Sequence, residues 1–232
     1  MDFDVFDRLA KAADEVRSTP GVRVVVVSGE GKSFSSGIDT GSFGSFSGTS
    51  EEMIARAQSG FRGIAALPMP TIAAVQGHAY GAGLQLALAC DIRVVTKDAS
   101  LGLLEHKYGI LPDLGGTQRL PLLTGPGIAK LMIWTAERIT GEEAARRGIA
   151  EIVVESDDLA VAVDQLAERI ASAPPRAVRE VKQLVDNAGR VDLEQGMDRE
   201  AEGQARLMAS PDFAEAIGAF MAKRLPNFTD DE

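Results

Sequence analysis

The sequence predicts an α/β protein, and three observations support this class. Strand-like apolar runs alternate with helix-like segments through the first two thirds of the 232 residues. Two of these strands lead straight into glycine-rich turns, at residues 34–39 and 77–83. After Asp157 the pattern becomes helical throughout. We therefore expect an α/β core over residues 1–156 and a C-terminal helical region over residues 157–232, part of whose apolar surface would pack against another subunit.

Each expected element follows from a local signal. Residues 4–19 repeat apolar side chains about every 3.6 residues, as amphipathic helices do, and Pro20-Gly21 ends that helix. Ser50 is the expected N-cap of the next helix, and Gly148 is a natural C-cap later in the chain. Residues 41–50 are rich in glycine and serine, which predicts a mobile loop. The expected elements in order are helix 4–19, strand 22–28, loop 41–50, helix 51–67, strand 71–75, a helix from residue 82, strand 91–96, an extended run 100–104, a turn 109–116, helices 128–135 and 142–147, strand 149–154, and helices broken at 174–175 and 210–211.

Composition and charge exclude several classes of protein. The formal net charge of −10 argues against a nucleic-acid binder, and any anionic ligand would need a local basic patch. A single cysteine, Cys90, excludes an internal disulfide and a cysteine metal cluster, and it is expected in the core. The sequence holds no run of about 18 apolar residues, and neither end carries a targeting signal. We expect a cytoplasmic protein with no membrane partner.

The two glycine-rich turns predict an oxyanion hole. Strand ends that lead into glycine-rich backbone can aim two N–H groups at one oxygen. In the second turn, Gly81 and Gly83 allow close backbone approach, and Ala82 between them starts a helix. Its N–H can then face a ligand. A plain tight turn before a helix would carry the same letters.

Three polar residues follow these turns and are candidates for acid–base chemistry. Gln85 lies one helical turn after Ala82, so it faces the same side; its amide orients groups but takes no proton. Glu105 follows Leu103-Leu104, and apolar neighbours raise a carboxyl pKa toward that of a proton carrier. Asp113 also has apolar neighbours, although Pro-Asp before Gly-Gly is good turn chemistry as well. The alternatives are a packing or solvent-facing glutamine and a surface glutamate. A serine hydrolase is disfavoured, because no G-x-S-x-G elbow is present.

Taken together, these segments resemble the crotonase superfamily, the enoyl-CoA hydratase/isomerase family. The motifs that carry the resemblance are FSSGID at 34–39, PTIAAVQGHAYGAG at 70–83, CDIR at 90–93, GILPDLGGTQRL at 109–120 and FMAKR at 220–224. The resemblance implies a spiral of ββα turns, with C-terminal helices that pack in trimers or hexamers. Family members usually begin with a β-hairpin, so roughly two or three dozen residues of the family pattern are expected to be absent before Met1.

The resemblance also implies site roles. The N–H groups of Ile38 and Ala82 would bind the thioester oxygen of an acyl-CoA substrate. Residues of the two turns and one lysine would contact the substrate or its CoA, with the lysine near the CoA phosphates; these are Ser36, Gly37, Asp39, Gly81 and Lys223. Coenzyme A would be part of the substrate, and we expect no metal and no separate cofactor.

One departure from the family pattern points to the reaction. Family hydratases carry two glutamates that hold and activate water; the second falls on Glu105, but the first falls on Gln85. Family dienoyl-CoA isomerases carry an aspartate eight residues after the Glu105 position, where Asp113 stands. We therefore expect double-bond isomerisation with Glu105 as the principal acid/base and Asp113 as a second proton carrier. The alternatives are an enoyl-CoA hydratase and a non-catalytic acyl-CoA-binding protein.

Overall fold

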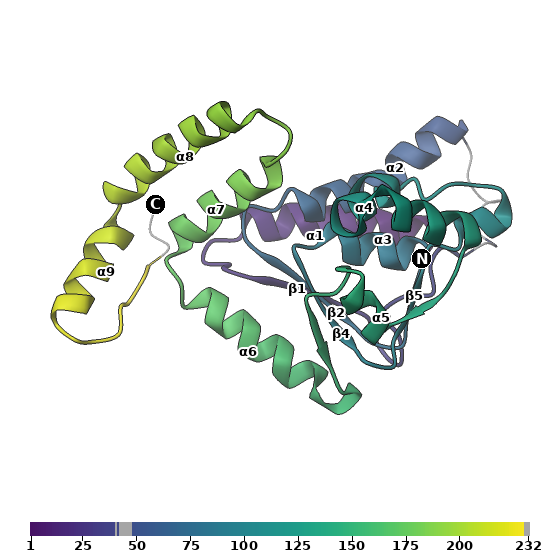
Figure 1. The fold of residues 1–232 in the computed structure, drawn as a ribbon, viewed down its shortest axis with the longest axis horizontal. Coiled ribbons are helices and arrows are strands. Elements are labelled where there is room, and N and C mark those ends of the chain that lie inside the picture. The colour runs from purple at the N-terminus through teal and green to yellow at the C-terminus, as the bar shows by residue number, and fades with distance from the viewer. Residues whose placement is uncertain (40, 42–47, 230–232) are drawn as a thin grey trace. The chain divides into compact units, whose positions relative to one another are not determined.

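A computed structural model describes residues 1–39, 41 and 48–229 (Figure 1). The chain forms two compact units, which are described separately. The first contains residues 1–18, 26–67 and 71–165, and the second contains residues 19–25, 68–70 and 166–232. The boundary predicted at residue 156 stays a prediction. The described helices include none that is both long and apolar enough to cross a membrane.

Two small sheets carry the first unit. The larger sheet has the strand order β1-β2-β4-β7, formed by β1 (Val25–Ser28), β2 (Thr71–Val75), β4 (Ile92–Thr96) and β7 (Ile152–Val154). β2 and β4 run parallel, as do β4 and β7. Every residue of β2 is buried, which explains its continuous apolar run and its clear prediction.

The second sheet was not predicted in full. It joins β3 (His78–Tyr80), β5 (Ser100–Gly102) and β6 (Ile139–Thr140) in that order. β3 and β5 are parallel, and β5 and β6 are antiparallel. The sequence predicts β5 as an extended run but places the residues of β3 in the glycine-rich turn. This sheet matters because β3 leads directly into that turn.

Two helices pair at the start of the first unit. α1 (Phe3–Ser18) packs on α2 (Ser50–Ala65), and the rings of Phe6 and Phe61 lie 6.1 Å apart between centroids. The expected N-cap of α2, Ser50, is wrong by one residue. Thr49 is the cap, because its hydroxyl accepts from the Glu52 N–H at 3.2 Å and the Glu52 carboxylate accepts from the Thr49 N–H at 2.8 Å.

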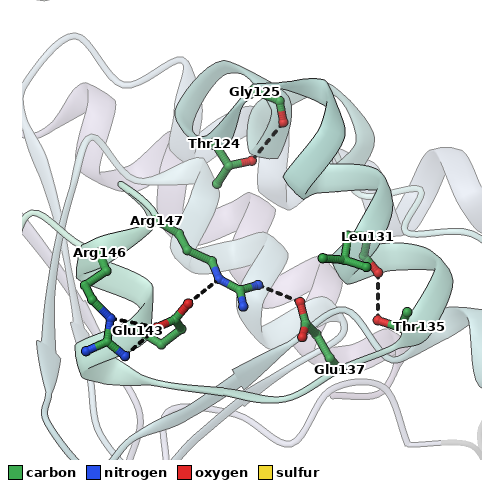
Figure 2. Close-up of polar contacts among 8 residues, drawn as sticks. All are labelled: Thr124, Gly125, Leu131, Thr135, Glu137, Glu143, Arg146 and Arg147. Carbon is green, nitrogen blue, oxygen red and sulfur yellow. Dashed lines mark hydrogen bonds and ion pairs between the residues drawn. The ribbon is translucent and has the colours of Figure 1, made fainter.

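α4 (Gly116–Thr135) begins twelve residues before the predicted helix 128–135. It is two helical segments joined at Gly125, whose φ of 76° and ψ of 159° are not helical. Thr124 closes this kink by donating to the Gly125 carbonyl at 3.1 Å, and Figure 2 shows the contact. Pro126 then starts the second segment, where a missing N–H costs nothing.

The corner after α4 is held by ion pairs. Arg147 follows α5 (Gly141–Arg146) and bridges Glu137 at 2.5 Å and Glu143 at 2.7 Å (Figure 2). Because Glu137 precedes β6 and Glu143 lies in α5, the guanidinium fixes the turn between α4 and α5. α6 (Leu159–Ala171) follows β7 after a short 3-10 turn, Ser156–Asp158.

The second unit contains α7 (Pro175–Asn187), α8 (Leu193–Met208) and α9 (Pro211–Met221). The breaks predicted at 174–175 and 210–211 are confirmed, whereas the break between α7 and α8 was not predicted. Asp212 near the start of α9 is buried and accepts from the Arg176 guanidinium at 2.7 Å. Glu180 of α7 pairs with Arg206 of α8 at 2.7 Å.

Candidate active site

The fold brings the two glycine-rich turns side by side. The Ser35 N–H donates to the His78 carbonyl at 2.8 Å, and the Tyr80 N–H donates to the Ser35 carbonyl at 3.0 Å. Gly37 has φ of 99°, and a Cβ on it would lie 2.9 Å from the Tyr80 oxygen and 3.9 Å from the Ala82 nitrogen. Glycine is therefore required where the first turn passes the second.

Ile38 and Ala82 stand on either side of this close approach. Ala82 is the first residue of α3 (Ala82–Ala89), where backbone N–H groups have no partner within the helix. In the described part of the chain, no acceptor is hydrogen-bonded to the Ile38 or the Ala82 N–H. The geometry brings the two predicted donors together, and their role as an oxyanion hole stays a prediction.

Glu105 lies directly against the second turn. It begins a short 3-10 helix, Glu105–Tyr108, just after β5, and only 9% of its surface is exposed. Gly81 has φ of 53°, and a Cβ on it would lie 3.1 Å from Glu105 Oε1. The backbone of the turn thus leaves space for the carboxylate beside the N-terminus of α3.

Gln85 connects Glu105 to the segment before α4. It is 1% exposed, so the solvent-facing alternative is wrong. Its Nε2 donates to Glu105 Oε1 at 2.8 Å, while its Oε1 accepts from the N–H groups of Leu114 at 2.7 Å and Gly116 at 2.9 Å. Both lone pairs of the amide oxygen are therefore occupied by backbone donors.

The environment of Glu105 raises the pKa of its carboxyl. Burial raises its pKa above the usual value, hydrogen bonds from its own backbone and from Gln85 oppose that rise, and the charge of Asp113 adds to it. Glu105 Oε2 is buried and has no hydrogen-bond partner among the described residues. One oxygen of this carboxylate is thus held, and the other remains available for a substrate proton.

Asp113 lies close enough for its charge to act on Glu105, and it is itself half-buried. Burial raises its pKa, while a hydrogen bond from its own backbone lowers it. Its carbonyl accepts from Gln58 Nε2 of α2 at 2.6 Å. Gln58 was missed from the sequence, where its place one turn before the buried Phe61 is only a weak signal.

The other predicted contacts are less enclosed. Ser36 and Asp39 are exposed on the first turn, and Asp39 Oδ1 accepts from the Gly41 N–H at 2.9 Å. Lys223 follows α9 in the second unit, is exposed and has φ of 52°. Its contact with CoA stays a prediction. Most of the loop predicted at 41–50 lies outside the described residues.

Comparison with known proteins identifies the family. The model of the enoyl-CoA hydratase/isomerase family matches residues 2–231. A crotonyl-CoA hydratase of Syntrophomonas wolfei is 37% identical over 227 residues, covering 97% of this chain and 87% of the relative. A peroxisomal Delta(3,5)-Delta(2,4)-dienoyl-CoA isomerase of Arabidopsis thaliana is 35% identical over 242 residues, covering 98% and 87%.

A solved structure agrees with these relatives. The enoyl-CoA hydratase of Bacillus anthracis superposes with a TM-score of 0.94 at 34% identity, covering all of this chain and 90% of that one. The predicted α/β class, with a crotonase-like core and C-terminal helices, is confirmed. The chain therefore belongs to the enoyl-CoA hydratase/isomerase family of the crotonase superfamily.

Proposed function

We propose that this enzyme moves the double bond of an enoyl-CoA thioester through an enolate. One observation carries the proposal: Glu105 Oε1 accepts a hydrogen bond from Gln85, while Oε2 is buried beside the Ala82 end of α3 with no hydrogen-bond partner in the described part of the chain. A buried carboxylate with one oxygen unpaired among the described residues, close to backbone N–H donors that none of those residues occupies, suits removal of an α-proton from a thioester.

The reaction requires one proton to leave and one to arrive. Glu105 Oε2 takes the α-proton of a 3-enoyl-CoA, and the electron pair of that C–H bond moves onto the thioester oxygen. The N–H groups of Ile38 and Ala82 stabilise this charge, and loss of one such donor costs roughly 10²–10³ in rate. A proton delivered to the γ carbon then leaves the double bond between the α and β carbons.

The state of Gln85 favours isomerisation over water addition. Hydration requires a group that activates water, and an amide does not titrate. The Gln85 oxygen is moreover filled by two backbone N–H groups, from Leu114 and Gly116. Isomerisation requires no activated water, and Glu105 with Asp113 supplies the two proton positions it uses.

Hydration of a 2-enoyl-CoA is the second candidate function. The proximity of Asp113 to Glu105 favours it, because two carboxyl groups can divide the activation of water and the protonation of the α carbon. A crotonyl-CoA hydratase among the relatives supports the same alternative.

A mass-spectrometric assay in heavy water separates these reactions. We expect 3-enoyl-CoA to give 2-enoyl-CoA of unchanged oxygen content that carries deuterium at the α or γ carbon. A product heavier by one water would show a hydratase and reject the isomerase. Tight binding of both esters with no turnover would show a non-catalytic acyl-CoA-binding protein.

Substrate contacts form the next part of the proposal. We propose that the first and second turns bind the acyl-CoA through Ser36, Gly37, Asp39 and Gly81, and that Lys223 contacts the CoA phosphates. The chain carries a net charge of −10, so a polyanionic ligand requires a local cation. Replacing Lys223 by alanine should raise KM while kcat changes little.

We further propose that the second unit assembles the protein as a homotrimer or hexamer. Several large apolar side chains of α8 and α9 are exposed, at Leu193, Met197, Phe220 and Met221. Exposed apolar surface of this kind is typical of subunit interfaces. Light scattering after gel filtration should give a mass three or six times that of the chain, and a monomer would contradict this.

A further inference from the structure

The segment that carries Asp113 is held from two helices. Gln85 of α3 accepts from its N–H groups at Leu114 and Gly116. Gln58 of α2 donates to the carbonyl of Asp113 itself at 2.6 Å. Of these contacts, only the one with Gln58 is made to Asp113 itself, the residue that carries the carboxyl. The proposed reaction gives Gln58 no role so far.

The amide of Gln58 is oriented by a second contact. Arg62, one turn further along α2, donates from Nη2 to Gln58 Oε1 at 2.7 Å. A guanidinium only donates, so the oxygen of Gln58 faces Arg62 and its NH₂ group faces Asp113. α2 is anchored in turn by its capping box and by the buried Phe61 and Ile64. A fixed helix thus presents a fixed donor.

We propose that Gln58 is a positioning residue that sets the Asp113 carboxyl for proton delivery to the γ carbon. This inference rests on the proposed isomerase function and on Asp113 as its second proton carrier. Among the described residues, the hydrogen bonds of the Gln58 side chain go to the Asp113 carbonyl and to Arg62, and none goes to Glu105, so Gln58 would act through the backbone of Asp113. A shift of that backbone would move the carboxyl away from the γ carbon and leave Glu105 with its Gln85 partner in place.

The two proton transfers can be measured separately, one as isomerisation and the other as exchange at the α carbon, and their ratio reports on the role of Gln58. Glu105 receives the α-proton, and Asp113 gives its own proton to the γ carbon and becomes a carboxylate. Exchange with water then returns a proton to Asp113 and removes one from Glu105. When Asp113 is misplaced, the enolate still forms at Glu105 but is reprotonated at the α carbon. Exchange at the α carbon then continues while isomerisation falls.

The test compares these two rates in heavy water with 3-enoyl-CoA. Gln58→Glu keeps the shape and the acceptor for Arg62, and it places an oxygen against the Asp113 carbonyl. We expect the ratio of isomerised product to α-deuterated substrate to fall about tenfold, the effect of one ordinary hydrogen bond. Asp113→Asn should lower the same ratio. If Gln58→Glu does not fold, Gln58→Met removes the donor without adding charge.

Gln76→Glu is the matched control. Gln76 Nε2 also donates to a backbone carbonyl, that of Gly31 at 2.9 Å, so this variant loses the same bond and gains the same charge elsewhere. Its ratio should equal that of the wild type. The inference is overturned if Gln58→Glu lowers both rates equally or leaves the ratio unchanged while Asp113→Asn lowers it. If the wild type exchanges α-protons but forms no isomer, the proposed function fails instead.

Discussion

Two buried charged groups in the first unit differ in how completely they are hydrogen-bonded. Arg93 on β4 is 3% exposed; its guanidinium donates to the carbonyls of Ile149 at 2.6 Å and Cys90 at 2.8 Å and pairs with Glu151. Glu105 is 9% exposed, and one of its two oxygens has no partner in the described structure. A polar group that is fully satisfied fixes a fold, whereas one left half satisfied is available for chemistry.

The difference also has an energetic side. The bonds of Arg93 tie the C-terminal end of α3 and the segment just before β7 to β4, so the network stabilises the same helix that presents Ala82. The free oxygen of Glu105 contributes nothing of this kind, because burying it without a donor costs folding free energy. The Arg93 network thus supports the geometry that the Glu105 site uses.

Replacing Glu105 should produce the largest effect. Glu105→Gln keeps an acceptor for Gln85 but removes the base, so kcat for isomerisation should fall about 10³-fold. Steady-state assay by mass spectrometry measures it. Glu155→Gln is the control, since that carboxylate is a surface partner of Lys97 and should keep full activity. Retention of turnover by Glu105→Gln would reject Glu105 as the base.

Breaking the satisfied network should affect stability first. Arg93→Met removes the donors to two buried carbonyls and the partner of Glu151, so the free energy of unfolding should fall by about 3 kcal/mol. Glu151 is 37% exposed, so most of the loss comes from the carbonyls. Urea unfolding measures it, with the surface variant Arg146→Met as a control. A loss under about 1 kcal/mol would contradict the comparison.

Adding a second carboxylate should change the pH dependence. In Gln85→Glu, two carboxylates would face each other where the amide now donates at 2.8 Å, which raises the pKa of the pair. The base works when ionised, so α-proton exchange rises with pH through this pKa. The acidic limb of the pH profile for α-proton exchange should therefore shift to higher pH by about one pH unit. Measuring α-proton exchange across a pH series tests this shift, with Gln118→Glu as the control. A limb that does not shift would show that residue 85 and Glu105 do not interact in this way.

Removing the neighbouring charge should have the smallest effect, with the opposite sign. The charge of Asp113 adds to the burial that raises the pKa of Glu105. Asp113→Asn removes this charge from the enzyme form in which Asp113 is ionised and lowers the pKa of Glu105 in that form, so the acidic limb of the pH profile for α-proton exchange should move to lower pH by less than about one unit. The same exchange assay measures it. An upward shift would show that Asp113 does not act on Glu105 through its charge.

Short-range patterns were enough to find most of the fold and the candidate residues. The buried strand β2, the start of α3 and the carboxyl at Glu105 each follow from a few neighbouring letters. The N-cap at Thr49 could also be predicted, because Glu52 three residues later forms the second half of a capping-box pattern. Strands as short as β3 and β6 carry too few residues to show alternation, and Pro121 lies inside the first segment of α4, where a proline disfavours a helix prediction.

The contacts that give the site its properties could not be predicted in this way. Gln85 meets Leu114 and Gly116, which lie 29 and 31 residues away in sequence, and Gln58 meets Asp113 across 55 residues. Such pairs depend on how helices and turns assemble, which local propensity does not encode. The sequence therefore showed that Gln85 lacks a titratable group, but not that its amide is already fully engaged.

The burial of α3 has a consequence for how this enzyme loses activity on heating. All eight residues of the helix are buried, so it has no outer face from which to fray or to shift. Amide protons in its interior should exchange with solvent only when the whole unit opens. The Ala82 N–H then keeps its orientation until the unit unfolds. Loss of activity on heating should thus coincide with global melting, with no earlier inactive but folded state.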